Sequence, residues 1–162
     1  MTTKNESILA HGFFYDELPV GRCFRTMGRT ITETDLVSYI NLTWFTEELF
    51  VNTHDNHGRA LTGRVVPGSM VYAFAEGLLT PSMQFTGLAF LGAELDVRAP
   101  TVVGDTIHVE AEVIEARPAS KGNRGLVRTR NAVVNQRGEP TLIYNPLRLV
   151  LGSAAESAPH VT

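Results

Sequence analysis

In the first third of the chain, the spacing of hydrophobic residues predicts a strand and then a helix. Residues 22–31 have the pattern of a strand. Thr32 then favours a helix start, because its hydroxyl can cap the first turn and Asp35, three residues on, can complete a capping box. Apolar residues follow at near-helical spacing as far as Thr43, where we expect the helix to end.

Two further helices are predicted before the pattern changes. Thr46 can cap a short helical turn that has Glu47 and Glu48 at its start, where carboxylates suit the helix dipole. After a polar loop over residues 53–63, Pro67-Gly68 opens a helix that we expect to run to about Leu79. Its residues are apolar almost all round, which is typical of a helix buried on every side.

The second half of the chain reads as successive strands. Residues 88–97 are apolar, and residues 106–116 alternate strictly, which indicates an antiparallel strand with one face in solvent. Two more strands, 125–135 and 141–151, are joined by a glycine-containing hairpin turn. One sheet wrapped around one hydrophobic helix is the simplest packing, so the pattern predicts an α+β fold of hot-dog type.

Length and composition fit a single soluble domain. The chain has 162 residues, of which 43% are hydrophobic and 19% are charged, and its net charge is −3. We expect one domain over residues 11–152 with flexible tails at 1–10 and 153–162. The small negative charge gives no support for a nucleic-acid partner or for an anionic membrane surface.

The single cysteine, Cys23, has no internal disulfide partner, and we expect it to be a small buried hydrophobic residue near a strand start. The N-terminal residues lack the apolar core of a signal peptide, and no apolar run is long enough to span a bilayer. These features predict a cytoplasmic protein.

Leu42-Thr-Trp-Phe-Thr-Glu-Glu-Leu-Phe-Val-Asn52, followed by Gly63-Arg-Val-Val-Pro-Gly-Ser-Met70, carries a resemblance to the MaoC-like hot-dog hydratases. Their segment reads roughly L-T-G-D-x-N-P-x-H-x-D and then G-R-I-x-H-G-M. Weaker matching pieces occur in the same order along most of the chain, at residues 15–21, 29–37, 100–106 and 135–138. The resemblance implies a hot-dog fold, a dimer or heteromer of hot-dog units, an acyl-CoA or carrier-bound thioester as ligand, and no cofactor.

The positions that carry proton transfer in the family are altered here. Aligned without a gap, the family's catalytic Asp falls on Phe45, its Asn on Glu47, its catalytic His on Phe50 and its later His on Pro67. Phenylalanine transfers no protons, so the usual Asp/His mechanism is absent at these positions. Glu47 is the candidate replacement acid or base, and we expect it to be partly buried; the alternative is a carboxylate that only complements a helix dipole.

The oxyanion element of the family is retained. Gly68 lets the backbone approach a ligand closely, and amides at the start of the following helix can bind a developing negative charge. The alternative is that Pro67-Gly68 only starts a buried helix. Ser69 is a candidate donor to the thioester oxygen, or a helix cap.

Three aromatic side chains are candidate substrate contacts. Trp44, Phe45 and Phe50 either pack in the core or narrow the pocket, which would favour a short or aromatic acyl group.

Four further polar residues have open roles. Arg64 either binds a carboxylate or CoA phosphate or pairs with Glu47 or Asp55, and Arg98 is a second phosphate candidate. His54 and His57 are spaced as a metal pair but lack a third ligand, so no metal site is predicted. His54 remains a candidate proton carrier.

The leading hypothesis is a lyase, a hydratase or dehydratase of an acyl thioester with a modified site that uses Glu47. One alternative is a hot-dog thioesterase that uses a carboxylate and the helix-start amide. The other is a non-catalytic subunit that assembles with a competent MaoC-like chain.

Overall fold

A computed structural model describes residues 10–54 and 63–153 as an α+β fold. The helices are η1 (Tyr15–Glu17), α1 (Glu33–Thr43), α2 (Glu48–Val51) and α3 (Gly68–Met83). The strands are β1 (Cys23–Arg25), β2 (Arg29–Thr30), β3 (Gly87–Val97), β4 (Thr106–Pro118), β5 (Arg124–Val134) and β6 (Pro140–Leu151). The tails predicted at both ends lie almost wholly outside the described residues.

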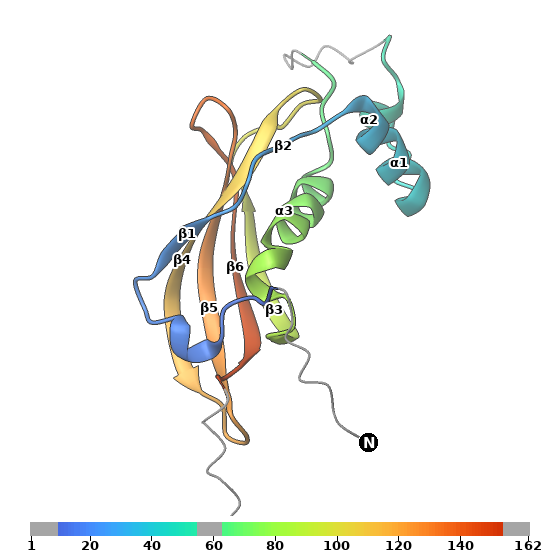
Figure 1. The fold of residues 1–162 in the computed structure, drawn as a ribbon. Helices are drawn as coiled ribbons and strands as arrows, with labels where there is room; N and C mark the ends of the chain where they lie inside the picture. Colours follow the sequence, from blue (N-terminus) through green and yellow to red (C-terminus); the bar gives the residue numbers. More distant parts are fainter. Residues whose placement is uncertain (1–9, 55–62, 154–162) are drawn as a thin grey trace, which may run out of the picture.

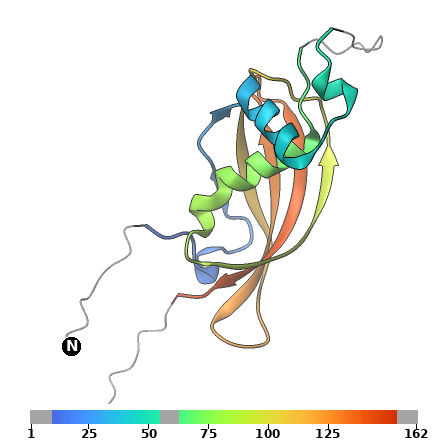
Figure 2. The same cartoon turned by 90° about the vertical axis from the view of Figure 1, so that its right-hand side faces the viewer.

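The sheet is antiparallel and curves around α3. Its strand order is β1-β4-β5-β6-β3, with β2 paired to the start of β4. Figures 1 and 2 show α3 lying across the concave face of the sheet, while α1 and α2 sit over its N-terminal end. The predicted wrapping of one sheet around one helix is confirmed.

Strand β4 has the predicted alternation. Ile107, Val109 and Val113 are fully buried on the inner face, whereas Glu110 and Glu112 are exposed on the outer face. A strand with one face on the core and one in solvent requires this pattern, because successive side chains point to opposite faces.

The strand predicted over residues 22–31 is divided into β1 and β2. Thr26 interrupts it: its N–H donates to the Val109 carbonyl at 2.9 Å, and its hydroxyl accepts from the Val109 N–H at 2.9 Å. A side chain thus takes the place of a main-chain acceptor, and the regular ladder stops. Cys23, in β1, is exposed, so the prediction that it is buried is wrong.

Helix α1 starts and ends where the sequence predicts. The Asp35 N–H donates to the Thr32 hydroxyl at 3.2 Å, and the Thr32 N–H donates to the Asp35 carboxylate at 2.9 Å. After Thr43 the chain turns through Trp44, which has a left-handed backbone with φ 57° and donates its N–H to the Ile40 carbonyl. In α2 the capping position is occupied by Glu47 rather than by Thr46, and its side chain makes no cap hydrogen bond.

Helix α3 is longer than predicted and has two different faces. It continues through Pro81 to Met83, because a proline in the last turn removes only one hydrogen bond near a helix end. Met70, Val71, Ala75 and Leu79 are buried against the sheet. Ala73 and Gly77, on the opposite face, are exposed in this chain, so the predicted burial on every side is not observed. No helix within the described ranges is long and apolar enough to cross a membrane.

Candidate functional site

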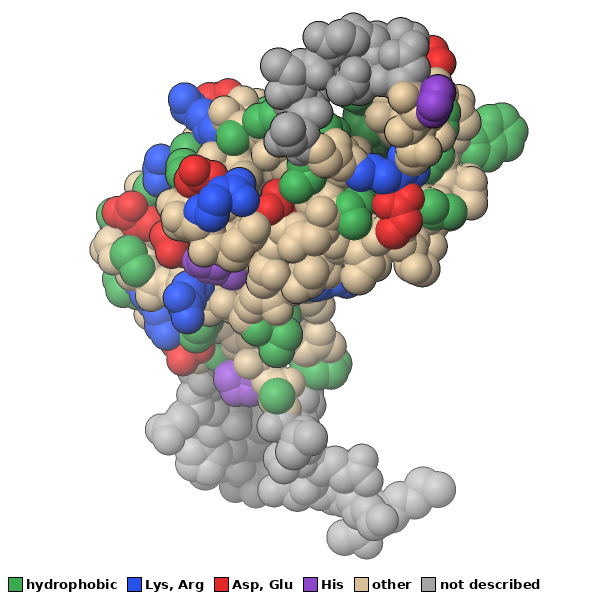
Figure 3. All heavy atoms as spheres, turned by 90° about the horizontal axis from the view of Figure 1, so that it is seen from above, with side chains coloured by type: hydrophobic (Ala, Val, Ile, Leu, Met, Phe, Trp, Pro, Cys, Tyr) green, Lys and Arg blue, Asp and Glu red, His purple; other side chains and the backbone are tan. Residues whose placement is uncertain are grey.

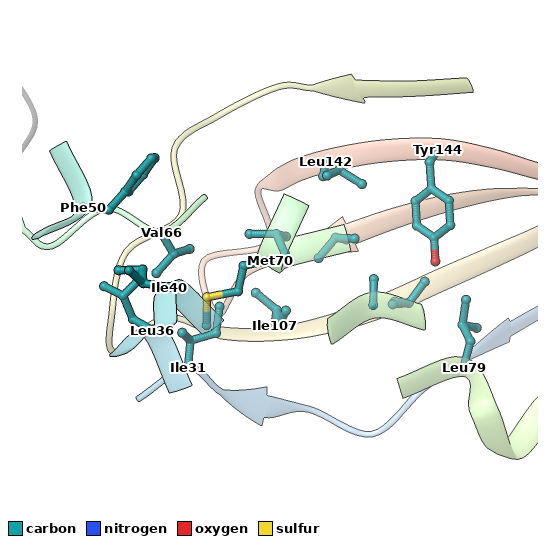
Figure 4. Close-up of a cluster of buried hydrophobic side chains, with 14 residues drawn as sticks. Ile31, Leu36, Ile40, Phe50, Val66, Met70, Leu79, Ile107, Leu142 and Tyr144 are labelled. Carbon is teal, nitrogen blue, oxygen red and sulfur yellow. The ribbon is translucent and has the colours of Figure 1, made fainter. Parts of the chain in front are cut away.

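A pocket of about 390 Å³ lies at the N-terminal end of α3. It is formed where the start of α3, α2, the end of β3 and the start of β6 come together, and its walls are mainly apolar. Figure 4 shows three of its lining side chains, Phe50, Val66 and Leu142, as members of the buried hydrophobic cluster. The volume falls in the range of small-molecule sites.

The first turn of α3 has two backbone amides without a hydrogen-bond partner in the part of the chain that the structure describes. The N–H groups of Met70 and Val71 both donate to the Pro67 carbonyl, at 3.0 and 3.2 Å. Within residues 10–54 and 63–153, no hydrogen bond engages the N–H of Gly68 or Ser69. Free amides at a helix start, beside the positive end of the helix dipole, favour an anionic or carbonyl oxygen.

Gly68 lines this pocket, and a side chain there would crowd it. A Cβ built at Gly68 lies 3.2 Å from a methyl carbon of Val97, which also lines the pocket. The backbone of Gly68 is not left-handed, so the reason for glycine is the close approach and not the conformation. Ser69 is exposed and does not line the pocket.

The three aromatic candidates have different positions. Phe50 is 6% exposed and lines the pocket, and Phe45 packs against it with ring centroids 5.3 Å apart. Trp44 is 85% exposed, so its ring packs neither in the core nor against this pocket. Viewed onto this end of the molecule, hydrophobic side chains are exposed among charged ones (Figure 3).

Glu47 precedes Phe50 by one helical turn but does not line the pocket. Phe50 donates its N–H to the Glu47 carbonyl at 2.9 Å, and the Glu47 side chain is exposed. The partial burial that we expected for this carboxylate is therefore not observed. His54 is also exposed, and its N–H donates to the Asn52 side-chain oxygen at 2.9 Å. Asp55 and His57 lie outside the described residues.

The two arginines are both paired. Arg64 bonds Glu33, at 2.5 Å, and not Glu47. Arg98 lines the pocket mouth while its guanidinium pairs with Asp96 at 2.6 Å, and both side chains are more than half exposed. An exposed pair of this kind is weak and can exchange partners, so Arg98 can reach an incoming anion.

Sequence reasoning missed most of the pocket wall. Val97, Thr101, Thr141 and Leu142 line it although they lie in β3, β6 and the loop after β3. Val97 and Leu142 are cross-strand partners, and the Arg98 N–H donates to the Thr141 carbonyl at 2.9 Å. Only the pairing of β3 with β6 brings them together, and no local signal marks them.

A half-buried charged cluster was also missed, further along α3. Arg148 donates to both carboxylate oxygens of Glu76 at 2.7 Å, and the Tyr144 hydroxyl donates to the same carboxylate at 2.9 Å. Burial raises the pKa of Tyr144 far above its usual range, and the Glu76 charge adds to the shift, so the hydroxyl stays protonated. The cluster ties the middle of α3 to β6 rather than facing the pocket.

Comparison with solved structures identifies the fold. A MaoC-like dehydratase from Rhodospirillum rubrum superposes with a TM-score of 0.76 at 22% identity, covering 87% of this chain and 98% of that one. An R-hydratase from Pseudomonas aeruginosa, in its unliganded form, gives 0.70 at 23% identity over 88% of each chain.

A conserved hypothetical protein from Mycobacterium tuberculosis with a double hot-dog fold gives a TM-score of 0.75 at 19% identity, covering 91% of this chain and 46% of that one. The chain has the hot-dog fold. It corresponds to one of the two units of the double protein. No family model and no curated protein sequence matches the chain.

Proposed function

We propose that this chain is a hydratase-like protein of the MaoC type that binds an acyl thioester. The observation that carries the proposal is the mainly apolar pocket lined by Gly68, whose N–H has no hydrogen-bond partner among the described residues. An acyl group would lie against the apolar walls, and its thioester oxygen would accept a hydrogen bond from the Gly68 amide at the start of α3, as a developing enolate requires. The similarity in fold to a MaoC-like dehydratase and an R-hydratase supports the same ligand class.

For hydration, the protein must also move protons. Among the described lining residues the charged side chain is that of Arg98, and a guanidinium group donates hydrogen bonds but does not serve as a general base. In our proposal Glu47, at the exposed N-terminus of α2, acts as acid or base from the rim after ligand binding. Phe45 and Phe50 narrow the pocket and favour a short or aromatic acyl group.

The test uses the intact protein and a series of enoyl-CoA thioesters from crotonyl to hexadecenoyl and cinnamoyl. Loss of the conjugated absorbance with short or aromatic substrates is expected. Calorimetry with the corresponding saturated acyl-CoA measures binding separately. Absence of both turnover and binding, while a control hydratase is active, would remove the proposal; thiol release without hydration would identify a thioesterase instead.

One observation favours a second candidate, a non-catalytic subunit. In the ungapped alignment Phe50 takes the place of the family's catalytic histidine, and Phe45 packs against it, so the described wall would bind an acyl group without transferring protons. The uncovered face of β3 supports assembly with another hot-dog unit, since Phe90, Leu95 and Val97 are about half exposed there. This candidate predicts acyl-CoA binding without turnover by the isolated chain, and turnover when a competent partner is added.

A further inference from the structure

A second, smaller cavity lies at the other end of α3. The space in it that is open to the centre of a water-sized sphere is about 30 Å³. It is lined by the last turns of α3, the turn at Thr86, the inner faces of β5 and β6, and the side chains of Phe13, Leu18 and Phe24. It is separate from the acyl pocket, because the two share no lining residue.

Two buried polar side chains line this cavity, Asn131 and Thr86, and each is 1% exposed. Among the described residues, neither polar atom of the Asn131 amide group has a partner with hydrogen-bond geometry, and the Thr86 hydroxyl oxygen has none either. Burial raises the pKa of the Tyr144 hydroxyl, and the Asn131 side chain lies near enough to that hydroxyl to lower the pKa slightly against this larger effect. Other polar groups at the cavity are satisfied: the Ser82 hydroxyl donates to the Leu79 carbonyl at 2.7 Å, and Arg148 is held by Glu76.

The unpaired groups would be costly in a dry interior. An unsatisfied buried donor or acceptor loses about 1–3 kcal/mol of hydration that nothing replaces. Asn131 is a buried residue of β5, and its side chain lies between those of Thr129 and Val133 on the inner face of the sheet. Native proteins satisfy such groups with ordered water when the cavity is polar and wide enough, which takes about 10–15 Å³ per molecule by this measure.

We infer that the cavity between the C-terminal half of α3 and the sheet is a hydration site, which holds about two ordered water molecules bridging the Asn131 amide and the Thr86 hydroxyl. The main chain of Thr86 already joins two elements, since its N–H donates to the Met83 carbonyl at 3.1 Å and its carbonyl accepts from Leu151 at 2.8 Å. The bridge to Asn131 adds β5 to this junction. The water therefore fixes the end of α3 on the sheet.

A high-resolution crystal structure of the intact protein is the direct test. Density for water within hydrogen-bond distance of both Asn131 and Thr86 is expected. An empty cavity, or an Asn131 amide turned to bond the neighbouring Tyr144 hydroxyl directly, would overturn the inference.

Thermal unfolding of conservative variants gives a second test, because the change in Tm has opposite signs for a hydrated and for a dry cavity. If water bridges the groups, Thr86→Val and Asn131→Leu each lower the Tm by about 3 °C, and the double variant loses less than the sum, because it expels the water as well. If the cavity is dry, Thr86→Val raises the Tm, since it replaces an unpaired hydroxyl by a methyl group. Thr80→Val, an exposed change on α3, is the control. If Asn131→Leu does not fold, the direction of the Tm change in Thr86→Val decides between the two cases.

Discussion

At the scale of single residues, two positions matter for the proposed acyl pocket: Gly68, which has no side chain, and Glu47, whose carboxylate lies outside the pocket. Gly68 has no side chain where a Cβ would meet Val97 at 3.2 Å. Glu47, which we aligned with the Asn of the MaoC-like segment, is exposed at the start of α2. The first feature concerns binding and the second concerns proton transfer, so substitutions at the two positions should affect different measurements.

We predict that Gly68→Ala weakens acyl-CoA binding about tenfold while the protein remains folded, since a tight contact of this kind costs about 1–2 kcal/mol. Calorimetry with a saturated acyl-CoA measures the effect. Gly77→Ala is the matched control on the same helix, because a Cβ there meets nothing within 4 Å. Equal affinities for wild type and Gly68→Ala would place the acyl group elsewhere.

If the isolated chain hydrates enoyl-CoA, Glu47→Gln should lower kcat by about 100-fold or more, because the amide cannot act as acid or base. Glu48→Gln changes the neighbouring exposed carboxylate, which accepts a hydrogen bond from Asn52 at 2.9 Å, and should leave kcat within a few-fold of wild type. Steady-state kinetics on both variants shows which of the two carboxylates contributes to turnover. Unchanged turnover in Glu47→Gln would exclude this carboxylate from the reaction.

At the scale of elements, α1 is held at its start by a reciprocal cap, and α3 by contacts along its length. Asp35 accepts from the Thr32 N–H and from the Arg29 guanidinium, at 2.9 and 2.7 Å. Helix α3 instead relies on its buried face and on the Glu76 contact to β6. The stability of α1 should therefore respond to pH through one carboxylate.

The hydrogen bond from the Thr32 backbone lowers the pKa of Asp35 in the folded protein, with the Thr32 hydroxyl and Arg29 contributing in the same direction. A lowered folded pKa stabilises the protein above the unfolded value, near 3.9, and that contribution is lost as the pH falls through the folded pKa. Wild type should therefore have a higher Tm than Asp35→Asn at pH 7, and the gap should close below about pH 4. Thermal unfolding across this pH range checks the prediction. If the difference in Tm between wild type and Asp35→Asn does not change with pH, it does not come from the charge of Asp35.

At the scale of the whole molecule, β3 is an edge strand of the sheet, and its apolar side chains are partly exposed. β3 is the last strand of the order, and α3 covers β4 and β6 rather than β3. Leu95 on this strand is 46% exposed, and Val97 both lies on the same strand and lines the acyl pocket. A second hot-dog unit placed here would bury the apolar strand and border the pocket.

We predict that the purified protein associates through β3, with itself or with a related chain, and that Leu95→Glu shifts it towards the 17.7 kDa monomer in light scattering. A buried unpaired carboxylate at such a contact is strongly unfavourable. Met27→Glu, a change at an exposed apolar residue between β1 and β2, should leave the assembly unchanged. A monomeric wild type that binds no hot-dog partner would contradict the prediction.

The sequence by itself determined what depends on neighbours along the chain: the Thr32–Asp35 cap, the alternation of β4, the hairpin before β6 and the α+β hot-dog fold. These follow from contacts within a few residues and from the period of hydrophobic positions. Only the tertiary structure decided which side chains meet in the pocket, that Glu47 is exposed, that Arg64 pairs with Glu33, and that Glu76 holds Arg148. Such contacts join residues that are distant in sequence, and they depend on how strands pair and how α1 and α2 sit over α3, which no local pattern specifies.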